Sequence, residues 1–318
     1  MNGGSATVSF LVRCAPLVAL AIYPIWADTF GLQLVTKCLI WAIFAMSLNL
    51  LVGFAGLVSF GHAAFYGIGA YTLMVLTSNF AATNFLISFP IALSVSGLAA
   101  LVVGILVLRS SGIYFIMATL AFAQMFYYFV ARSKALGGSD GAYVHIKPTL
   151  NLLGLFSVNL ADSLQFYFLC LVLTTTTFVL LAAIAASLFG RVLLAIRENE
   201  HRALALGFPT FRFKLAAFVI AGMLASIAGY LDAAQFGFVA PELFSWHQSG
   251  TVLMMVILGG LGTLYGPVLG AFAFTLLQHY LADLTQHWLL PMGILIIAVA
   301  LALPRGLAGL ARQRSAAR

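Results

Sequence analysis

The chain has 318 residues, of which 63% are hydrophobic and only 7% are charged, and its mean hydropathy is +1.09. Soluble domains carry about 25% charged residues, so this composition excludes a soluble protein and predicts one that crosses a membrane several times. The formal net charge of +7 does not indicate a nucleic-acid partner, because the basic residues are spread over short loops and the C-terminal end.

The apolar runs predict an all-α polytopic membrane protein with about ten spans in one domain, residues 1–318. The runs cover residues 11–26, 33–52, 63–79, 86–108, 113–130, 164–188, 213–236, 249–260, 267–281 and 288–303. The first run is predicted to be a retained span, since it shows no small-residue cleavage pattern and continues into Trp26. The eighth run is short, which favours a discontinuous helix.

The basic residues also predict an orientation with both termini in the cytoplasm. In that orientation the inside segments contain Arg13, Arg109, Arg191, Arg197, Arg202, Arg212, Lys214, Arg305, Arg312, Arg314 and Arg318, and the outside segments contain Lys37, Arg132, Lys134 and Lys147. Residues 304–318 then form a basic cytoplasmic tail beside the lipid bilayer.

One segment between the sixth and seventh predicted spans is rich in charge. It contains Arg191, Arg197, Glu198, Glu200, Arg202, Arg212 and Lys214. Each charge would cost about 2.5–3.5 kcal/mol at the centre of a membrane helix, so the segment is expected to lie in water. Asn199 is a predicted N-cap, and Gly207 and Pro209 predict a stop, which gives a helix of about seven residues. Its Ala and Leu face is expected to bind a groove on another protein.

Two glycine-rich stretches, residues 52–72 and 258–270, interrupt the apolar pattern. Paired breaks predict an internal repeat with a solute pathway at the repeat interface, because irregular backbone in a membrane needs protein or water to satisfy it. Close helix packing through small residues is the alternative. The pathway candidates are Asn49, Gly56, Ser59, Gly61, His62, Gln124, Gly259, Gly262 and Gly266. The polar side chains among them are expected to face the interior, either as interhelical hydrogen bonds or as contacts to a solute.

Several kinds of chemistry are not indicated. The sequence has no phosphate-binding G-x-x-x-x-G-K-[ST] motif and no metal-ligand cluster, so no cofactor or metal is predicted. The three cysteines, Cys14, Cys38 and Cys170, have no paired spacing and are interpreted as small hydrophobes. The stretch Gly137–Gly141 fits G-x-S-x-G around Ser139, but its external loop lacks the strand–elbow–helix context of a hydrolase.

Several stretches in order resemble the branched-chain amino acid ABC transporter permeases of the LivM type. They are MSLNLLVGFAGLVSFGHAAFYGIGAYT (46–72), SGIYFIMATLAFAQM (111–125), GGSDG (137–141), FGRVLLAIRENEHRALALG (189–207), MVILGGLGTLYGPVLGA (255–271) and LPRGLAGL (303–310). The resemblance implies an importer subunit of a prokaryotic inner membrane. It implies as partners a second related permease, two cytoplasmic ATPases that use ATP and Mg, and an external substrate-binding protein.

The resemblance also assigns residues 189–214 as the segment that couples to an ATPase, with Arg191, Arg197, Glu198, Asn199, Glu200, Arg202 and Gly207 as its candidate residues. The sequence departs from the family pattern at Val58–Phe60, at Ser110 and Ser111, and at Met223–Ser226. These changes bear on the width of the pathway and thus on the solute.

The leading hypothesis is an importer permease for branched-chain or other small hydrophobic amino acids. Urea or a short amide is an alternative solute. The pathway is expected to be hydrophobic and to contain no buried charge, and such a pathway would not distinguish an amino acid from urea. An ion-coupled transporter or channel is an alternative of another class, but it needs intramembrane carboxylates, and only Asp232 lies near a span, toward its outer end. A membrane-bound enzyme would depend on Ser139 alone.

Overall fold

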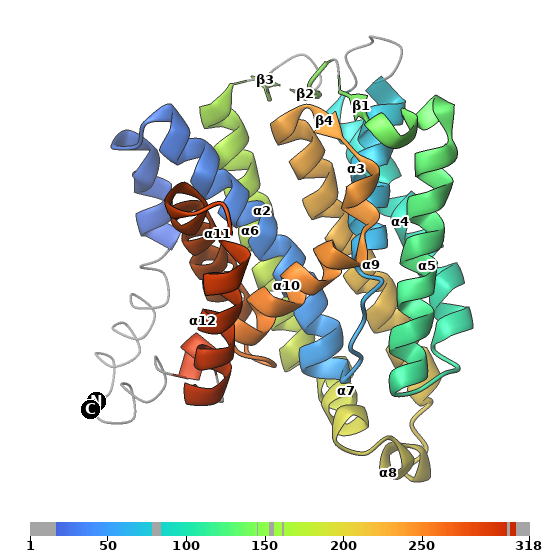
Figure 1. The fold of residues 1–318 in the computed structure, drawn as a ribbon. Coiled ribbons are helices and arrows are strands. Elements are labelled where there is room, and N and C mark those ends of the chain that lie inside the picture. The colour runs from blue at the N-terminus through green and yellow to red at the C-terminus, as the bar shows by residue number, and fades with distance from the viewer. Residues whose placement is uncertain are drawn as a thin grey trace, which may run out of the picture.

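The computed structural model describes residues 17–77, 84–144, 146–152, 156–160, 162–303 and 306–309, and they are mostly helical (Figure 1). The α-helices are α2 (Thr29–Asn49), α3 (Ala63–Thr77), α4 (Phe85–Val107), α5 (Ile113–Arg132), α6 (Ser163–Ala186), α7 (Leu188–Glu198), α8 (Glu200–Ala205), α9 (Thr210–Phe236), α10 (Trp246–Gly259), α11 (Gly266–Leu284) and α12 (Leu289–Ala302). A π-helical turn, η2 (Leu50–Ala55), continues α2.

The second to tenth predicted spans correspond to α2, α3, α4, α5, α6, α9, α10, α11 and α12. The first, residues 11–26, lies largely outside the described residues; residues 17–22 are helical and Tyr23–Ile25 form a 3-10 turn. Within the described ranges, five helical segments are long and apolar enough to cross a bilayer, namely Thr29–Ala55, Phe85–Val107, Ile113–Arg132, Ser163–Ala186 and Thr210–Phe236. The prediction of an all-α membrane protein is confirmed, and the count of ten spans stays a prediction.

Short strands cap one end of the molecule and were not predicted. Strand β1 (Ala142–Tyr143) pairs antiparallel with β4 (Phe238–Val239), and β2 (Thr149–Leu152) pairs antiparallel with β3 (Phe156–Asn159). Helices α7 and α8 lie at the opposite end (Figure 1). The charged segment and the long loop between α5 and α6 are therefore on opposite sides of the helical body, as the predicted topology requires.

The helices differ in how far the protein itself covers them. The most apolar stretch of Thr29–Ala55 is wholly buried and that of α9 is 72% buried, whereas no more than a third of the corresponding stretch in α4, α5 or α6 is buried. Helices that are apolar all round belong either in a core or against lipid. Helices α2 and α9 therefore form the centre, and α4, α5 and α6 present apolar faces to the bilayer.

Helices α3 and α9 approach each other through glycines. A Cβ atom added to Gly69 would overlap the Ser226 carbonyl, and one added to Gly229 would overlap the Tyr66 carbonyl. Small residues at such contacts allow membrane helices to pack backbone to backbone. This contact holds α3 against the central helix.

We expect Gly229→Ala to separate α3 from α9 and to lower the free energy of unfolding by about 1–3 kcal/mol, the usual cost of overpacking. Gly293→Ala in α12 is the matched control, because an added Cβ there has nothing within 4 Å. The thermal unfolding midpoint of the purified protein in detergent measures both. Equal midpoints for the two variants would contradict the packing argument.

Candidate functional site

The charged segment folds as two helices joined at Asn199. Ser187 caps α7 by accepting a hydrogen bond from the Gly190 N–H at 3.3 Å. The Asn199 side chain caps α8 by accepting from the Arg202 N–H at 3.0 Å, which confirms the predicted N-cap. The predicted helix of about seven residues is α8, with six residues. Helix α7 was not predicted from the sequence.

Helix α8 is held against α7 and α9 by an apolar cluster and an ion pair. Val192, Ile196 and Ala203 are buried together and pack against Phe213. The Glu200 carboxylate accepts from the Lys214 ammonium at 2.6 Å and from the Thr210 hydroxyl at 3.0 Å. Lys214 is buried inside the protein, so the expectation that the whole charged set lies in water is wrong for this residue.

The pKa of Glu200 reflects this environment. Burial raises the pKa of the Glu200 carboxyl, but the hydrogen bond and charge of Lys214, with smaller effects of Thr210 and His201, outweigh it, and the pKa lies below its ordinary value. The carboxyl therefore stays ionised at neutral pH and keeps its pair with Lys214.

Apolar side chains are exposed at the end of α8 and in the turn that follows it. Leu204 is 49% exposed, Leu206 is 70% exposed and Phe208 is 36% exposed. These three residues form what we call the α8 surface. The charges around it make the segment unsuited to lipid.

The remaining predicted coupling residues lie on α7, on α8 and in the turn after α8. Arg191, Glu198 and Arg202 are exposed. Gly207 has a φ of +85°, a left-handed conformation that suits glycine, and ends the α8 turn.

Arg197 makes the connection from α7 to the membrane helices. Its guanidinium donates a hydrogen bond from Nη1 to the Gly53 carbonyl in η2. The same side chain lies over Gly56, where φ is +70°, and its Nη1 would be 3.0 Å from a Cβ atom at Gly262. We call Gly53, Gly56 and Gly262 the glycine junction, because the two predicted glycine breaks meet there.

Asn49 joins the two breaks directly. Its side-chain amide donates to the Thr263 carbonyl at 2.9 Å and accepts from the Gly262 N–H at 3.1 Å. A Cβ atom added to Gly53 would be 2.7 Å from the Gly262 nitrogen, so only glycine allows this approach. Asn49, just before the first glycine-rich stretch, thus satisfies irregular backbone of the second stretch, and Arg197 satisfies the Gly53 carbonyl of the first.

The second break lies between α10 and α11, as the short eighth run predicted. Gly259 ends α10, and Gly266 begins α11 with its N–H donating to the Thr263 hydroxyl at 3.1 Å. A Cβ atom at Gly259 would overlap the Gly266 carbonyl, so the chain reverses direction with little space between the two helices.

The first break leads into α3 through a buried polar turn. His62 is fully buried; its Nε2 lies 2.8 Å from the Ser47 hydroxyl, and its ring stacks on Phe44 with centroids 5.6 Å apart. Ser59 accepts from the Gly61 N–H at 3.2 Å. A Cβ atom at Gly61 would overlap the Thr119 carbonyl of α5. These pathway candidates therefore pack inside the helical body.

Gln124 is separate from this group. It is half-buried on α5 and forms no hydrogen bond to the other pathway candidates in the ranges that the structure describes. Ser139, the residue of the hydrolase alternative, is exposed in a 3-10 turn and donates to the Asp140 carboxylate at 3.1 Å.

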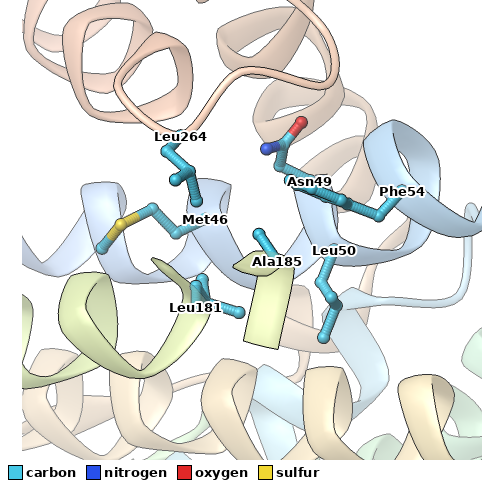
Figure 2. Close-up of a pocket in the computed structure, with 7 residues that line it drawn as sticks. All are labelled: Met46, Asn49, Leu50, Phe54, Leu181, Ala185 and Leu264. Carbon is cyan, nitrogen blue, oxygen red and sulfur yellow. The ribbon is translucent and has the colours of Figure 1, made fainter. Parts of the chain in front are cut away.

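A small cavity lies beside the junction (Figure 2). Its lining residues are Met46, Asn49, Leu50, Phe54, Leu181, Ala185 and Leu264, and its volume is about 10 Å³. That volume holds about one water molecule, so an amino acid does not fit there in this conformation.

One carboxyl group is buried among the membrane helices. Asp232 lies toward the end of its span, as expected, since α9 ends at Phe236, but it is only 8% exposed and faces into the protein. The expectation of a hydrophobic pathway without a buried charge stays a prediction. The sequence showed the carboxylate within an apolar run; it did not show that α2 and α3 cover it.

We expect Asn49→Leu to lower the free energy of unfolding by about 1–3 kcal/mol, because it leaves the Gly262 N–H and the Thr263 carbonyl without their partner. Gln124→Leu is the matched control and should change stability by less than about 0.5 kcal/mol. Thermal unfolding in detergent compares the two variants, and a Gln124 effect as large as that of Asn49 would contradict the role of the bridge.

We also expect Glu200→Gln to loosen α8, seen as faster hydrogen–deuterium exchange in residues 200–205, whereas Glu198→Gln leaves exchange unchanged. Because the pKa of Glu200 is lowered in the folded protein, its ion pair stabilises α8 above about pH 4.3, the unfolded pKa, and is lost as pH falls through the lower folded value. Acidification should therefore reproduce the Glu200→Gln exchange pattern in the unmodified protein. Unchanged exchange at acidic pH would contradict the pairing.

Comparisons of the sequence with known proteins identify a transport family. The family model described as branched-chain amino acid transport system / permease component matches residues 31–300. The high-affinity branched-chain amino acid transport system permease proteins LivM of Salmonella typhimurium LT2 and Escherichia coli K12 are each 30% identical over 329 aligned positions, covering 97% of this chain and 77% of the relative. The autoinducer 2 import system permease protein LsrC of Klebsiella pneumoniae is 40% identical over 92 residues, 27% of each chain. No solved structure matches significantly. The chain belongs to the family of permease components of branched-chain amino acid transport systems.

Proposed function

We propose that this chain is the permease subunit of an ATP-driven importer of branched-chain or other small hydrophobic amino acids. Family membership and the similarity to the LivM proteins over 97% of the chain support this proposal. The observation that carries it is the arrangement of the α8 surface: exposed leucines on a polar segment, connected through Arg197 to the glycine junction.

In this proposal the α8 surface docks on a cytoplasmic ABC ATPase. An apolar helix face bound in a groove is a common recognition mode, and burying one exposed leucine stabilises a complex by about 1.5–3 kcal/mol. Arg191, Arg197, Glu198, Asn199, Glu200, Arg202 and Gly207 are the coupling residues, with Arg197 as the direct contact to the membrane helices. The ATPases supply ATP and Mg chemistry, and this chain binds neither.

The assembly would contain a second, related permease, two ATPases and an external substrate-binding protein, in a prokaryotic inner membrane. Both termini would face the cytoplasm, with the coupling segment 189–214 and the tail 304–318 on that side. The pathway would be lined by the two glycine-broken segments, including Asn49, Gly56, Ser59, Gly61, His62, Gln124, Gly259, Gly262 and Gly266. Its opening would separate the stretches that meet at the junction.

The test is ATP-dependent leucine uptake by the complete complex in proteoliposomes. We expect Leu206→Glu to reduce uptake and ATPase association about tenfold or more, since a buried leucine contributes about 1.5–3 kcal/mol. Leu284→Glu is the matched control: Leu284 is 80% exposed but ends α11, the helix that begins at the junction and runs away from it. Its uptake should be unchanged.

The outcomes separate the hypotheses. Normal uptake by Leu206→Glu would contradict coupling through the α8 surface. Uptake abolished by a proton uncoupler with ATP intact would support an ion-coupled transporter instead. Competition by urea and not by leucine would assign the alternative solute.

A further inference from the structure

Helix α5 is the least covered of the five long spans that the described residues form. Only 22% of its most apolar stretch is buried, against 33% in α4 and 28% in α6. One narrow side of α5 packs inward through Phe115, Thr119, Ala123 and Val130, and the Thr119 carbonyl lies against Gly61. The opposite side is exposed, at the edge of the helical body (Figure 1).

The exposed side of α5 forms a regular row along the helix. The residues of this row, which we call the α5 face, are Tyr114, Met117, Ala121, Met125 and Tyr128, and they are spaced three, four, four and three residues apart. This spacing places the side chains in a single line against which a second helix can pack. The four large side chains of the row are 54–76% exposed.

The middle of the α5 face is not composed like a surface for lipid. On the neighbouring span α4, the large exposed side chains are all aliphatic, namely Leu86, Ile87, Ile91, Val95, Leu98, Leu101, Val102 and Leu106. The α5 face instead has a methionine on each side of the small Ala121. Methionine is enriched at protein interfaces, and a small residue lets two membrane helices approach closely. The tyrosines near its ends would suit lipid headgroups as well, so the argument depends on the middle.

A polar side chain without a partner lies on the same side of the helix. Gln124 follows Met117 by seven residues, two turns along, so the two point in nearly the same direction. Gln124 is half-buried near the middle of α5, and its amide has no hydrogen bond within the described part of the chain. An amide facing lipid is costly, and such groups normally hydrogen-bond to another membrane helix. The helices described here do not provide that partner.

We propose that the α5 face is the surface on which the second permease packs. A membrane helix of that subunit lies along Met117, Ala121 and Met125, and one of its polar groups hydrogen-bonds to the Gln124 amide. The inference rests on the proposed function, which places a second, related permease beside this chain, and it names the surface between them. The α5 face lies within a span, so neither a cytoplasmic ATPase nor an external binding protein can cover it. Lipid stays against the aliphatic side of α4.

The test is photo-crosslinking in the complete complex, expressed with all its subunits. Benzoylphenylalanine is placed at the position of Met117 or Met125, and at the position of Val95 as the matched control. Val95 is 43% exposed near the middle of α4. We expect both α5 positions to give an adduct of this chain with the second permease, identified by mass spectrometry, and Val95 to give none.

Three results of the crosslinking would overturn the proposal. They are no adduct with the second permease from either α5 position, an adduct with a second copy of this chain instead, and an equal yield from Val95.

Two substitutions test the contact itself. After dilution in detergent, less of the second permease should be recovered with the tagged chain, about fivefold less or lower for Ala121→Phe, which adds bulk, and about threefold less for Gln124→Leu, which removes a hydrogen bond. Val95→Phe is the control for added bulk and should leave recovery unchanged. Gln124→Leu should leave the unfolding midpoint of the purified chain nearly unchanged, which separates loss of contact from loss of structure. Full recovery with both variants would contradict the packing.

The unmodified complex reports on the proposed function separately, through its ATP-driven leucine uptake and its content of the second permease. An active complex that contains the second permease but gives no adduct from α5 would overturn the role of the α5 face and leave the proposed function intact. Absence of the second permease from the complex would overturn both.

Discussion

The structure depends on one requirement: backbone that leaves the helical pattern inside a membrane must find its hydrogen bonds within the protein. Helix α2 unwinds through η2 into a non-helical turn, and α10 stops at a second turn. Each turn alone would leave polar groups in an apolar surrounding. Asn49 satisfies a donor and an acceptor of the second turn at once, and Gly53 allows the two turns to touch. This contact joins the end of α2 to the turn between α10 and α11, the two helices against which α2 also packs.

The same junction is also in contact with the polar segment at the surface. Arg197 reaches from α7 to the Gly53 carbonyl, and α8 is fixed to α7 and α9 by Ala203 and by the Glu200–Lys214 ion pair. A short, packed series of side chains thus joins α8 to the junction, which is the connection that the proposed coupling requires. Asp232 is buried on the same central helix as Lys214, near the other end, and the close packing on α3 at Gly229 lies between them.

Sequence alone predicted most of the helices, because long apolar runs bounded by charge, Gly and Pro leave few alternatives. It also predicted the N-cap at Asn199 and the two breaks, since capping residues and clustered glycines are local signals. It did not predict that the breaks touch, that Arg197 bonds to Gly53, or that Asp232 is covered by α2 and α3. Those are contacts between residues far apart in the chain, and periodicity contains no information about them. The roles of the pathway candidates stay predictions.

The bridge at Asn49 is also weak in absolute terms. Three hydrogen bonds, two from Asn49 and one from Arg197, join the two turns to each other and to α7, and a protein hydrogen bond contributes about 0.5–1.5 kcal/mol net. Parting them costs a few kcal/mol, about the energy that one or two leucines release on burial. The two turns are thus held together by contacts whose net free energy is no larger than that of one or two buried leucines. In the coupling that we propose, a partner docked on α8 would therefore release enough free energy on binding to separate them.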